Sequence, residues 1–164
     1  MSLPHLPAKA PACLALKIPP LVLLALCAAG IWFTPAWGHP PWLLAGRWAM
    51  VPALLLGLLG LATCLAGVAA FRRAQTTVNP CSPAQTTTLV AQGIYRYSRN
   101  PMYLGFALCL LALCLARGQM LGLLWWMGWI VYLQRYQIHP EEQALQAKFG
   151  SPYLHYCQQV RRWI

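Results

Sequence analysis

Apolar residues are gathered into four long runs that polar or proline-rich segments separate. The runs cover residues 18–33, 49–71, 101–116 and 120–133. The second run is long enough to cross the roughly 30 Å hydrocarbon core of a bilayer as a helix, and Arg72 and Arg73 end it. Only a few residues separate the last two runs, which favours a tight helical hairpin. The pattern predicts an all-α, polytopic membrane protein with about four transmembrane helices.

The remaining segments indicate how the chain is organised. Residues 1–17, rich in Pro and Ala, are expected to form a cytoplasmic tail, and residues 18–164 a single domain. The first apolar run also has the basic start and apolar stretch of a signal peptide. No clear cleavage site follows it, so an uncleaved helix is the preferred interpretation, and whether it is ever cleaved stays open.

The last part of the chain, residues 134–164, is amphipathic. Pro140 is followed by two acids, and both features favour the start of a helix. Gly150 and Pro152 predict the end of that helix and the start of another. We therefore expect amphipathic cytoplasmic helices after the fourth span.

Composition supports a surface that faces lipid. Hydrophobic residues make up 59% of the 164 residues and charged residues only 9%, whereas a soluble domain carries roughly 25% charged residues. The net charge of +10 would suit a nucleic-acid partner. The basic residues flank the apolar runs instead of forming one patch, so no such partner is expected.

The basic residues also predict the orientation in the membrane. With the N-terminus in the cytoplasm, Arg47 and Arg117 fall outside and all the others fall inside, as the positive-inside rule requires. The inside set is Lys9, Lys17, Arg72, Arg73, Arg96, Arg99, Arg135, Lys148, Arg161 and Arg162. Both termini are then cytoplasmic, and a bacterial inner membrane is the expected location.

The seven cysteines do not indicate a metal site. Cys27, Cys64, Cys109 and Cys114 lie inside apolar runs, where cysteine behaves as a small hydrophobic residue. No C-x-x-C pair is present, so the spacing supports neither a zinc site nor a disulfide framework. We expect reduced structural thiols and no bound metal.

Two polar islands meet on the expected cytoplasmic face. The segment 93–105, GIYRYSRNPMYLG, places aromatic rings and Arg99 at the start of the third apolar run, and the segment HPEEQ at 139–143 holds both acids of the chain. Helix-start N–H groups and Arg99 can bind a carboxylate. Glutamate can pair with an ammonium or bind ribose hydroxyls, and tyrosine can stack on adenine or face a sulfonium. S-adenosylmethionine carries all these groups, whereas NADPH would want more cations for its phosphates.

The order of these pieces resembles a known family. LVAQGIYRYSRNPMYLG followed by PEEQALQAKFGSPYLHYCQQVRRW is similar to the membrane methyltransferases that include isoprenylcysteine carboxyl methyltransferase and the phospholipid N-methyltransferases. The family pattern is Gly-x-Tyr, Arg-His-Pro-x-Tyr-x-Gly, a hydrophobic hairpin, Glu-Glu and Phe-Gly-x-x-Tyr. The resemblance covers about residues 74–164, and the ordered combination carries it.

The resemblance implies S-adenosylmethionine as the cofactor and assigns residues to its pocket. The residues expected to contact it are Leu89, Val90, Tyr95, Asn100, Pro101, Met102, Tyr103, Glu141 and Glu142. Arg135 or Gln137 falls where a substrate-facing polar residue would lie. Arg99 and Asn100 are the candidate catalytic residues.

One position departs from the family pattern, because Asn100 stands where the family has histidine. Asparagine donates and accepts hydrogen bonds but cannot carry a proton charge. An anionic acceptor needs no base in the transfer step, so the change favours a carboxylate or thiolate over an amine. Whether it alters activity stays open.

The functional expectation is an integral-membrane, S-adenosylmethionine-dependent methyltransferase, similar to isoprenylcysteine carboxyl methyltransferase. Its partners would be the bilayer and a lipid-like or small carboxylate, thiol or amine acceptor. Two alternatives stay open: an NADPH-dependent enzyme resembling the membrane sterol reductases, and a non-catalytic membrane binding protein. The acceptor and the oligomeric state do not follow from the sequence.

Overall fold

The computed structural model describes residues 18–35, 47–74, 89–118 and 120–164, with only the backbone of residues 47 and 48. The predicted tail, residues 1–17, lies outside this range. The elements are α1 (Pro20–Phe33), α2 (Arg47–Arg73), the 3₁₀ turn η2 (Gly93–Arg96), α3 (Pro101–Arg117), α4 (Gly122–Leu133), the π-helical turn η3 (Gln134–Ile138), α5 (His139–Phe149) and α6 (Ser151–Gln159). No strand occurs among the described residues, which confirms the all-α prediction.

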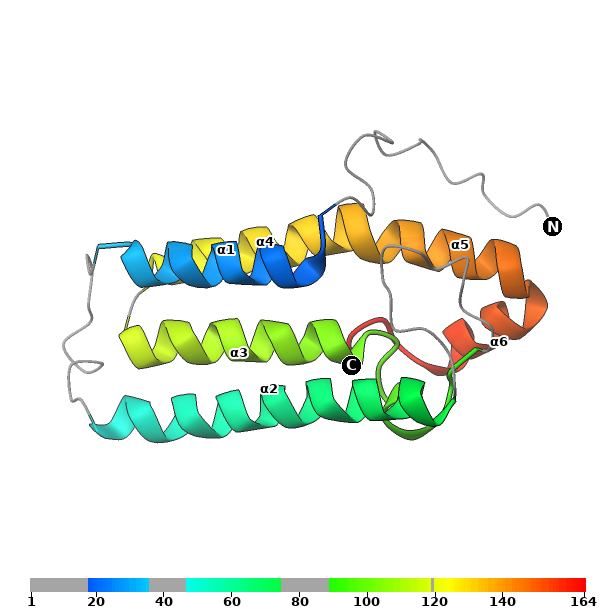
Figure 1. The fold of residues 1–164 in the computed structure, drawn as a ribbon, viewed down its shortest axis with the longest axis horizontal. Helices are drawn as coiled ribbons and strands as arrows, with labels where there is room; N and C mark the ends of the chain where they lie inside the picture. The colour runs from blue at the N-terminus through cyan, green and yellow to red at the C-terminus, as the bar shows by residue number, and fades with distance from the viewer. Residues whose placement is uncertain (1–17, 36–46, 75–88, 119) are drawn as a thin grey trace.

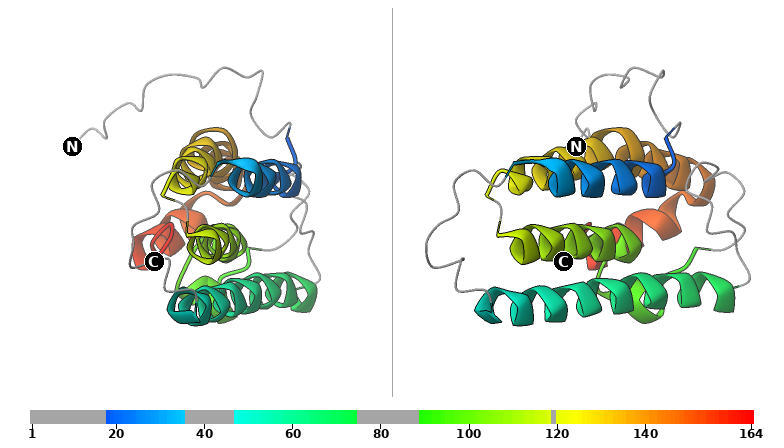
Figure 2. Two further views of the ribbon diagram at one scale, coloured as in Figure 1. Left: turned by 90° about the vertical axis from the view of Figure 1, so that its left-hand side faces the viewer. Right: turned by 60° about the vertical axis from the view of Figure 1, so that its left-hand side comes forward.

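The long helices run side by side along one axis. α1 and α4 lie next to each other, and α3 lies between this pair and α2 (Figure 1; end-on in Figure 2). The most extensive packing is between α2 and α3. α5 continues the line of α4 beyond the bundle, and α6 turns back below it towards the start of α3 (Figure 1).

α2 and α3 pack closely because glycines face each other. A Cβ atom built on Gly60 would lie 2.7 Å from the carbonyl oxygen of Gly105, and one built on Gly105 would lie 2.5 Å from that of Gly60. Any side chain at either position would push the helices apart. Small residues commonly bring membrane helices together in this way.

Tryptophans and an arginine join α1, α3 and α4. The Trp125 indole Nε1 donates to Thr34 Oγ1 at 2.9 Å, and Trp126 Nε1 donates to the Ala107 carbonyl at 2.8 Å. Arg117, which ends α3, lies over the Trp32 ring at 4.7 Å and donates to the Trp32 carbonyl. Fully buried Trp129 packs edge-on against Phe106. These contacts fix the α1–α4 pair on α3.

One described helix, Ala49–Arg73, is long and apolar enough to cross a membrane by length and composition. α1 and α3 are apolar but shorter. Four transmembrane helices are therefore not confirmed, and that number stays a prediction.

The start of α5 differs from the sequence interpretation. α4, η3 and α5 form one uninterrupted helix, since Leu133, Ile138 and His139 all have right-handed helical backbone angles. Pro140 therefore lies within a continuous helix and does not begin a separate one. The boundary at Gly150 is confirmed: α5 ends at Phe149, Gly150 has a positive φ of 58°, and α6 follows directly.

Candidate functional site

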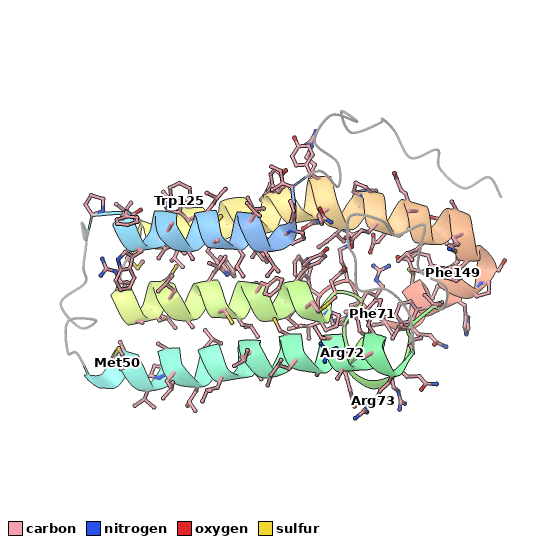
Figure 3. The ribbon with its side chains drawn as sticks, in the orientation of Figure 1. Met50, Phe71, Arg72, Arg73, Trp125 and Phe149 are labelled. Atoms are coloured by element: carbon pink, nitrogen blue, oxygen red, sulfur yellow. The ribbon has the colours of Figure 1, made fainter. Side chains whose placement is uncertain are left out.

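Four segments converge where α3 begins. These are η2, the first turn of α3, the first turn of α5, and α6 with the residues that follow it. Side chains fill the space between them at the right-hand end of the bundle, near the labelled Phe71 and Phe149 (Figure 3). Both acids of the chain lie here, although each has entirely different partners.

Glu141 is held by neutral groups. The Tyr103 hydroxyl donates to Glu141 Oε1 at 2.7 Å, and the Gln137 side-chain amide donates to the same oxygen at 2.8 Å. Within the described part of the chain, Glu141 Oε2 accepts no hydrogen bond, and no arginine or lysine pairs with Glu141. The site therefore contains a carboxylate whose charge no described arginine or lysine neutralises.

The surroundings of Glu141 favour its protonated form. Burial raises the pKa of Glu141 from its ordinary value near 4.5 to about 7, while the hydrogen bonds from Tyr103 and Gln137 act in the opposite direction. The negative charge of Glu142 adds a smaller upward contribution to that pKa. A cation placed beside Glu141 would favour ionisation by direct attraction.

Glu142, the next residue, is neutralised twice. Arg162 binds it with two contacts, Nη2 to Oε2 at 2.6 Å and Nε to Oε1 at 3.1 Å. Arg99 Nη1 lies 3.3 Å from Oε1 and also contacts the Cys157 sulfur at 2.6 Å. The side chains of Arg99 and Glu142 are each only 15% exposed. This bidentate pair fixes geometry and leaves little capacity for a ligand.

The residues after α6 are tied to the start of α3. The Arg99 backbone N–H donates to the Arg161 carbonyl at 3.0 Å, and Asn100 Nδ2 donates to the Arg162 carbonyl at 3.1 Å. Ser98 Oγ donates to the same carbonyl at 3.5 Å. The side chain of Asn100, the predicted catalytic residue, thus holds the C-terminal segment. The direct catalytic role of Asn100 stays a prediction.

Tyr95 lies at the back of the site. It is 5% exposed, its ring meets Phe71 edge-on at a centroid distance of 5.3 Å, and its carbonyl accepts a hydrogen bond from the Tyr156 hydroxyl at 2.8 Å. Burial raises the pKa of the Tyr95 hydroxyl, and the nearby Tyr156 and Glu141 add to the shift. Tyr103 therefore places an aromatic ring in contact with Glu141, and Tyr95 lies near enough to be influenced by its charge.

The other predicted cofactor residues are spread more widely. Leu89 packs on the cluster of Tyr153, Tyr156 and Val160, and Val90 is half-buried near it in the chain. Pro101 is buried as the first residue of α3. The Met102 side chain points at Gly67 of α2, so it serves helix packing.

The two predicted substrate-facing residues have different surroundings. Arg135 is exposed, with its guanidinium 6.0 Å from the Tyr136 ring centre. Gln137 is 1% exposed and bonds Glu141, so it acts on the acid directly.

Sequence reasoning missed Arg162 and Cys157. Both complete the ion-pair network around Glu142. In the sequence Arg162 counted only as a basic residue on the cytoplasmic side. Its role depends on a contact between residues twenty positions apart in different elements, which no local pattern indicates.

The chain is similar in sequence to known proteins. The sequence model of the phospholipid methyltransferase family matches residues 48–152. An uncharacterized protein from Haemophilus influenzae is 43% identical over 66 residues, which is 38% of this chain and all of that protein. No solved structure matches.

The family match spans α2, η2, α3, α4 and α5, including Tyr95, Tyr103 and Glu141. It covers more than half of the chain, so this protein belongs to the phospholipid methyltransferase family. Membership implies methyltransferase activity in general, and with the apolar helix α2 it indicates association with a membrane.

Proposed function

We propose that this protein is a membrane methyltransferase that uses S-adenosylmethionine and transfers its methyl group to a lipid-like or small acceptor. The observation that carries the proposal is Glu141. It is an acid in a strongly basic chain, and the described residues supply two neutral donors to one of its oxygens and no cation. Leaving such a group uncompensated costs stability unless a ligand completes it.

A cationic, aromatic ligand fits this arrangement. The free oxygen of Glu141 suits an ammonium, a sulfonium or a pair of ribose hydroxyls, and the rings of Tyr95 and Tyr103 offer faces to a cation or a purine. S-adenosylmethionine combines these groups in one molecule. When bound, it would supply a methyl group activated on a positively charged sulfur.

The contributions of the chain are binding and orientation. Tyr103 and Gln137 fix the Glu141 carboxylate, and the Arg99–Glu142–Arg162 network fixes the start of α5 against the start of α3. In the transfer, a lone pair of the acceptor would form the bond to the methyl carbon while the electron pair of the broken carbon–sulfur bond stays on the sulfur. An anionic acceptor needs no proton removed, and an amine must lose one to water or a nearby base. Holding both reactants in line would supply most of the acceleration.

The NADPH alternative fits less well. Its phosphates would need several free cations, yet Arg99 and Arg162 are engaged by Glu142. A non-catalytic binding protein stays compatible with the same pocket and differs only in turnover. Both alternatives are outcomes of the experiment below.

We also propose that the site faces the cytoplasm of a bacterial inner membrane and that α1, α2, α3 and α4 all cross it. One support is that these helices run side by side in one bundle (Figure 1). The other is the charge distribution in the sequence, with ten basic residues on the expected inner side and two outside. The predicted role of Arg135 in binding the acceptor belongs to this proposal, because its exposed side chain lies at the same end.

The test is calorimetric titration of the detergent-purified full chain with S-adenosylhomocysteine and, separately, with NADPH. Wild type should bind the first saturably and the second not at all. Glu141→Gln should lose at least 10-fold in affinity while Gln143→Ala, an exposed position on the same helix, stays within 2-fold of wild type.

Three other outcomes of these experiments would each contradict one part of the proposal. Binding of NADPH alone would assign the chain to the reductase alternative. If Glu141→Gln binds S-adenosylhomocysteine as tightly as wild type, Glu141 does not belong to the cofactor site. Binding without methyl transfer to any lipid, thiol, carboxylate or amine acceptor would favour the non-catalytic alternative.

A further inference from the structure

The π-helical turn η3 lies directly before the site. α4 passes through Gln134–Ile138 into α5 without a break (Figure 1), and the His139 N–H donates to the Gln134 carbonyl five residues back. Such turns are rare and often mark functional positions. The cause here can be read from the sequence.

Pro140 accounts for the wide turn. In an α-helix its ring would clash with the carbonyl four residues earlier, that of Tyr136, and it has no N–H to donate. Tyr136 lies inside η3. A wider turn moves this carbonyl away from the proline ring, so the helix continues where a regular one would kink or end.

A π-turn also changes which face of α5 points inward. Leu133 is 1% exposed and marks the inward direction of α4. In a regular α-helix of about 100° per residue, Glu141 would point about 80° away from Leu133. Because each residue of a π-turn advances by a smaller angle, five of them turn Glu141 back towards the direction of Leu133.

The contacts agree with this rotation. Gln137 and Ile138 are consecutive, and they are 1% and 0% exposed, so the turn buries two adjacent side chains. Glu141 then meets Tyr103 of α3 at 2.7 Å. Gln137, one turn earlier, reaches the same carboxylate oxygen.

We propose that Pro140 is a positioning residue: by enforcing the π-turn it rotates α5 so that Glu141 faces Tyr103 and the proposed cofactor site. The functional part of this inference rests on the proposed role of Glu141 in cofactor binding. The geometric part does not, and it can be tested without any ligand.

The test compares Pro140→Ala with Pro152→Ala in the full chain. Pro152 lies in the first turn of α6, where proline is tolerated and no π-turn exists, so it is the matched control. Two readouts are used: the affinity for S-adenosylhomocysteine, and the pH at which the infrared band of the protonated Glu141 carboxyl disappears. Glu141→Gln identifies that band.

Pro140→Ala should lose at least 10-fold in affinity, and its Glu141 band should disappear in the ordinary glutamate range, about pH 4–5, because the carboxyl then turns towards water. Its thermal midpoint should equal or exceed that of wild type, since alanine suits a helix interior. Pro152→Ala should keep wild-type values in both readouts.

The inference would be overturned if the Glu141 band of Pro140→Ala disappeared at the same pH as in wild type. It would also be overturned if the affinity of Pro140→Ala for S-adenosylhomocysteine stayed within 2-fold of wild type. If wild type binds no S-adenosylhomocysteine, the proposed function is refuted. The pH at which the Glu141 infrared band disappears would then be the remaining test of whether Pro140 rotates α5. A lower thermal midpoint in both Pro140→Ala and Pro140→Gln would show that Pro140 serves folding instead and would also overturn it.

Discussion

Glu141 and Glu142 are neighbours in the chain and opposites in their surroundings. Glu142 is bound by two arginines, one of them with a bidentate contact, and thereby joins α5 to the start of α3 and to the C-terminal segment. Among the described residues, Glu141 receives neutral donors alone, on one of its two oxygens. The first arrangement is complete without a ligand, and the second is not.

The difference indicates a structural role for Glu142 and a binding role for Glu141. A sequence motif presents both acids as equivalent, yet the helix turns them towards different partners. The four predictions that follow test whether the two acids really differ, from the largest expected effect to the smallest.

The largest effect is expected at Glu141. Between about pH 4.5 and about pH 7 the folded protein holds the Glu141 proton more tightly than the unfolded chain, so the free energy of unfolding falls as pH rises through that window. Glu141→Gln is neutral throughout and removes this fall. At pH 8 the ligand-free variant should be more stable than wild type by up to about 3 kcal/mol, with no difference at pH 4. Denaturation in detergent at both values checks this; a less stable variant at pH 8 would contradict it.

Glu142→Gln should have the opposite sign. It leaves Arg99 and Arg162, half-buried, without their counter-charge. Because the network is partly exposed, we expect a loss of about 2 kcal/mol, below the cost of breaking a fully buried pair. Raising the salt concentration should narrow the gap only slightly, because pairs removed from solvent are screened little. Equal stability of Glu142→Gln and wild type would remove the structural role of this acid.

A smaller effect is expected at Tyr103. Tyr103→Phe removes one donor to the Glu141 carboxylate and keeps the ring, so the pKa of Glu141 should rise further. The loss of stability above pH 8 should be about 1.5 kcal/mol, the lower end of the range for a hydrogen bond to a charged group. A pH series of thermal unfolding measures both. Phe106→Leu, a change of similar size on the same helix but away from the site, is the control and should leave the pH dependence unchanged.

The smallest effect is expected at Asn100. Asn100→Ala removes the bond to the Arg162 carbonyl, so the C-terminal segment should loosen at a cost of about 1 kcal/mol. If Asn100 only tethers this segment, methyl transfer to a bound acceptor should keep its kcat while the affinity for S-adenosylhomocysteine falls a few-fold. A large fall in kcat with an unchanged affinity for S-adenosylhomocysteine would instead support the catalytic role of Asn100 that the sequence predicted.

The sequence predicted those parts of the fold that depend on local pattern. Arg72 and Arg73 end α2, Pro101 begins α3, and Gly150 separates α5 from α6, all as expected. These features follow from proline and glycine backbone chemistry and from the charge of helix ends. The helix that carries the site could not be predicted to the same degree, because the rule that places proline at helix starts does not say whether the preceding turn is also helical.

The candidate site was predicted in composition but not in roles. Tyr95, Tyr103, Gln137 and Glu141 do lie together. Asn100 and Met102 were expected in the same site; their side chains contact the C-terminal segment and α2, and their contacts with the cofactor stay predictions. The different surroundings of the two acids depend on Arg162. Its contact with Glu142 requires α6 to turn back towards the bundle, which no local sequence pattern indicates.

The central claim is that Glu141 is the uncompensated acid, and infrared titration tests it most directly. The chain has only two acidic side chains, so the bands of protonated carboxyls are few. In wild type, one carboxyl band should disappear near pH 7. The same band should be absent from Glu141→Gln and present in Glu142→Gln. The terminal carboxyl is common to all three proteins and cancels in the difference spectra. A band near pH 7 that vanishes in Glu142→Gln, or none above about pH 5 in wild type, would contradict the account.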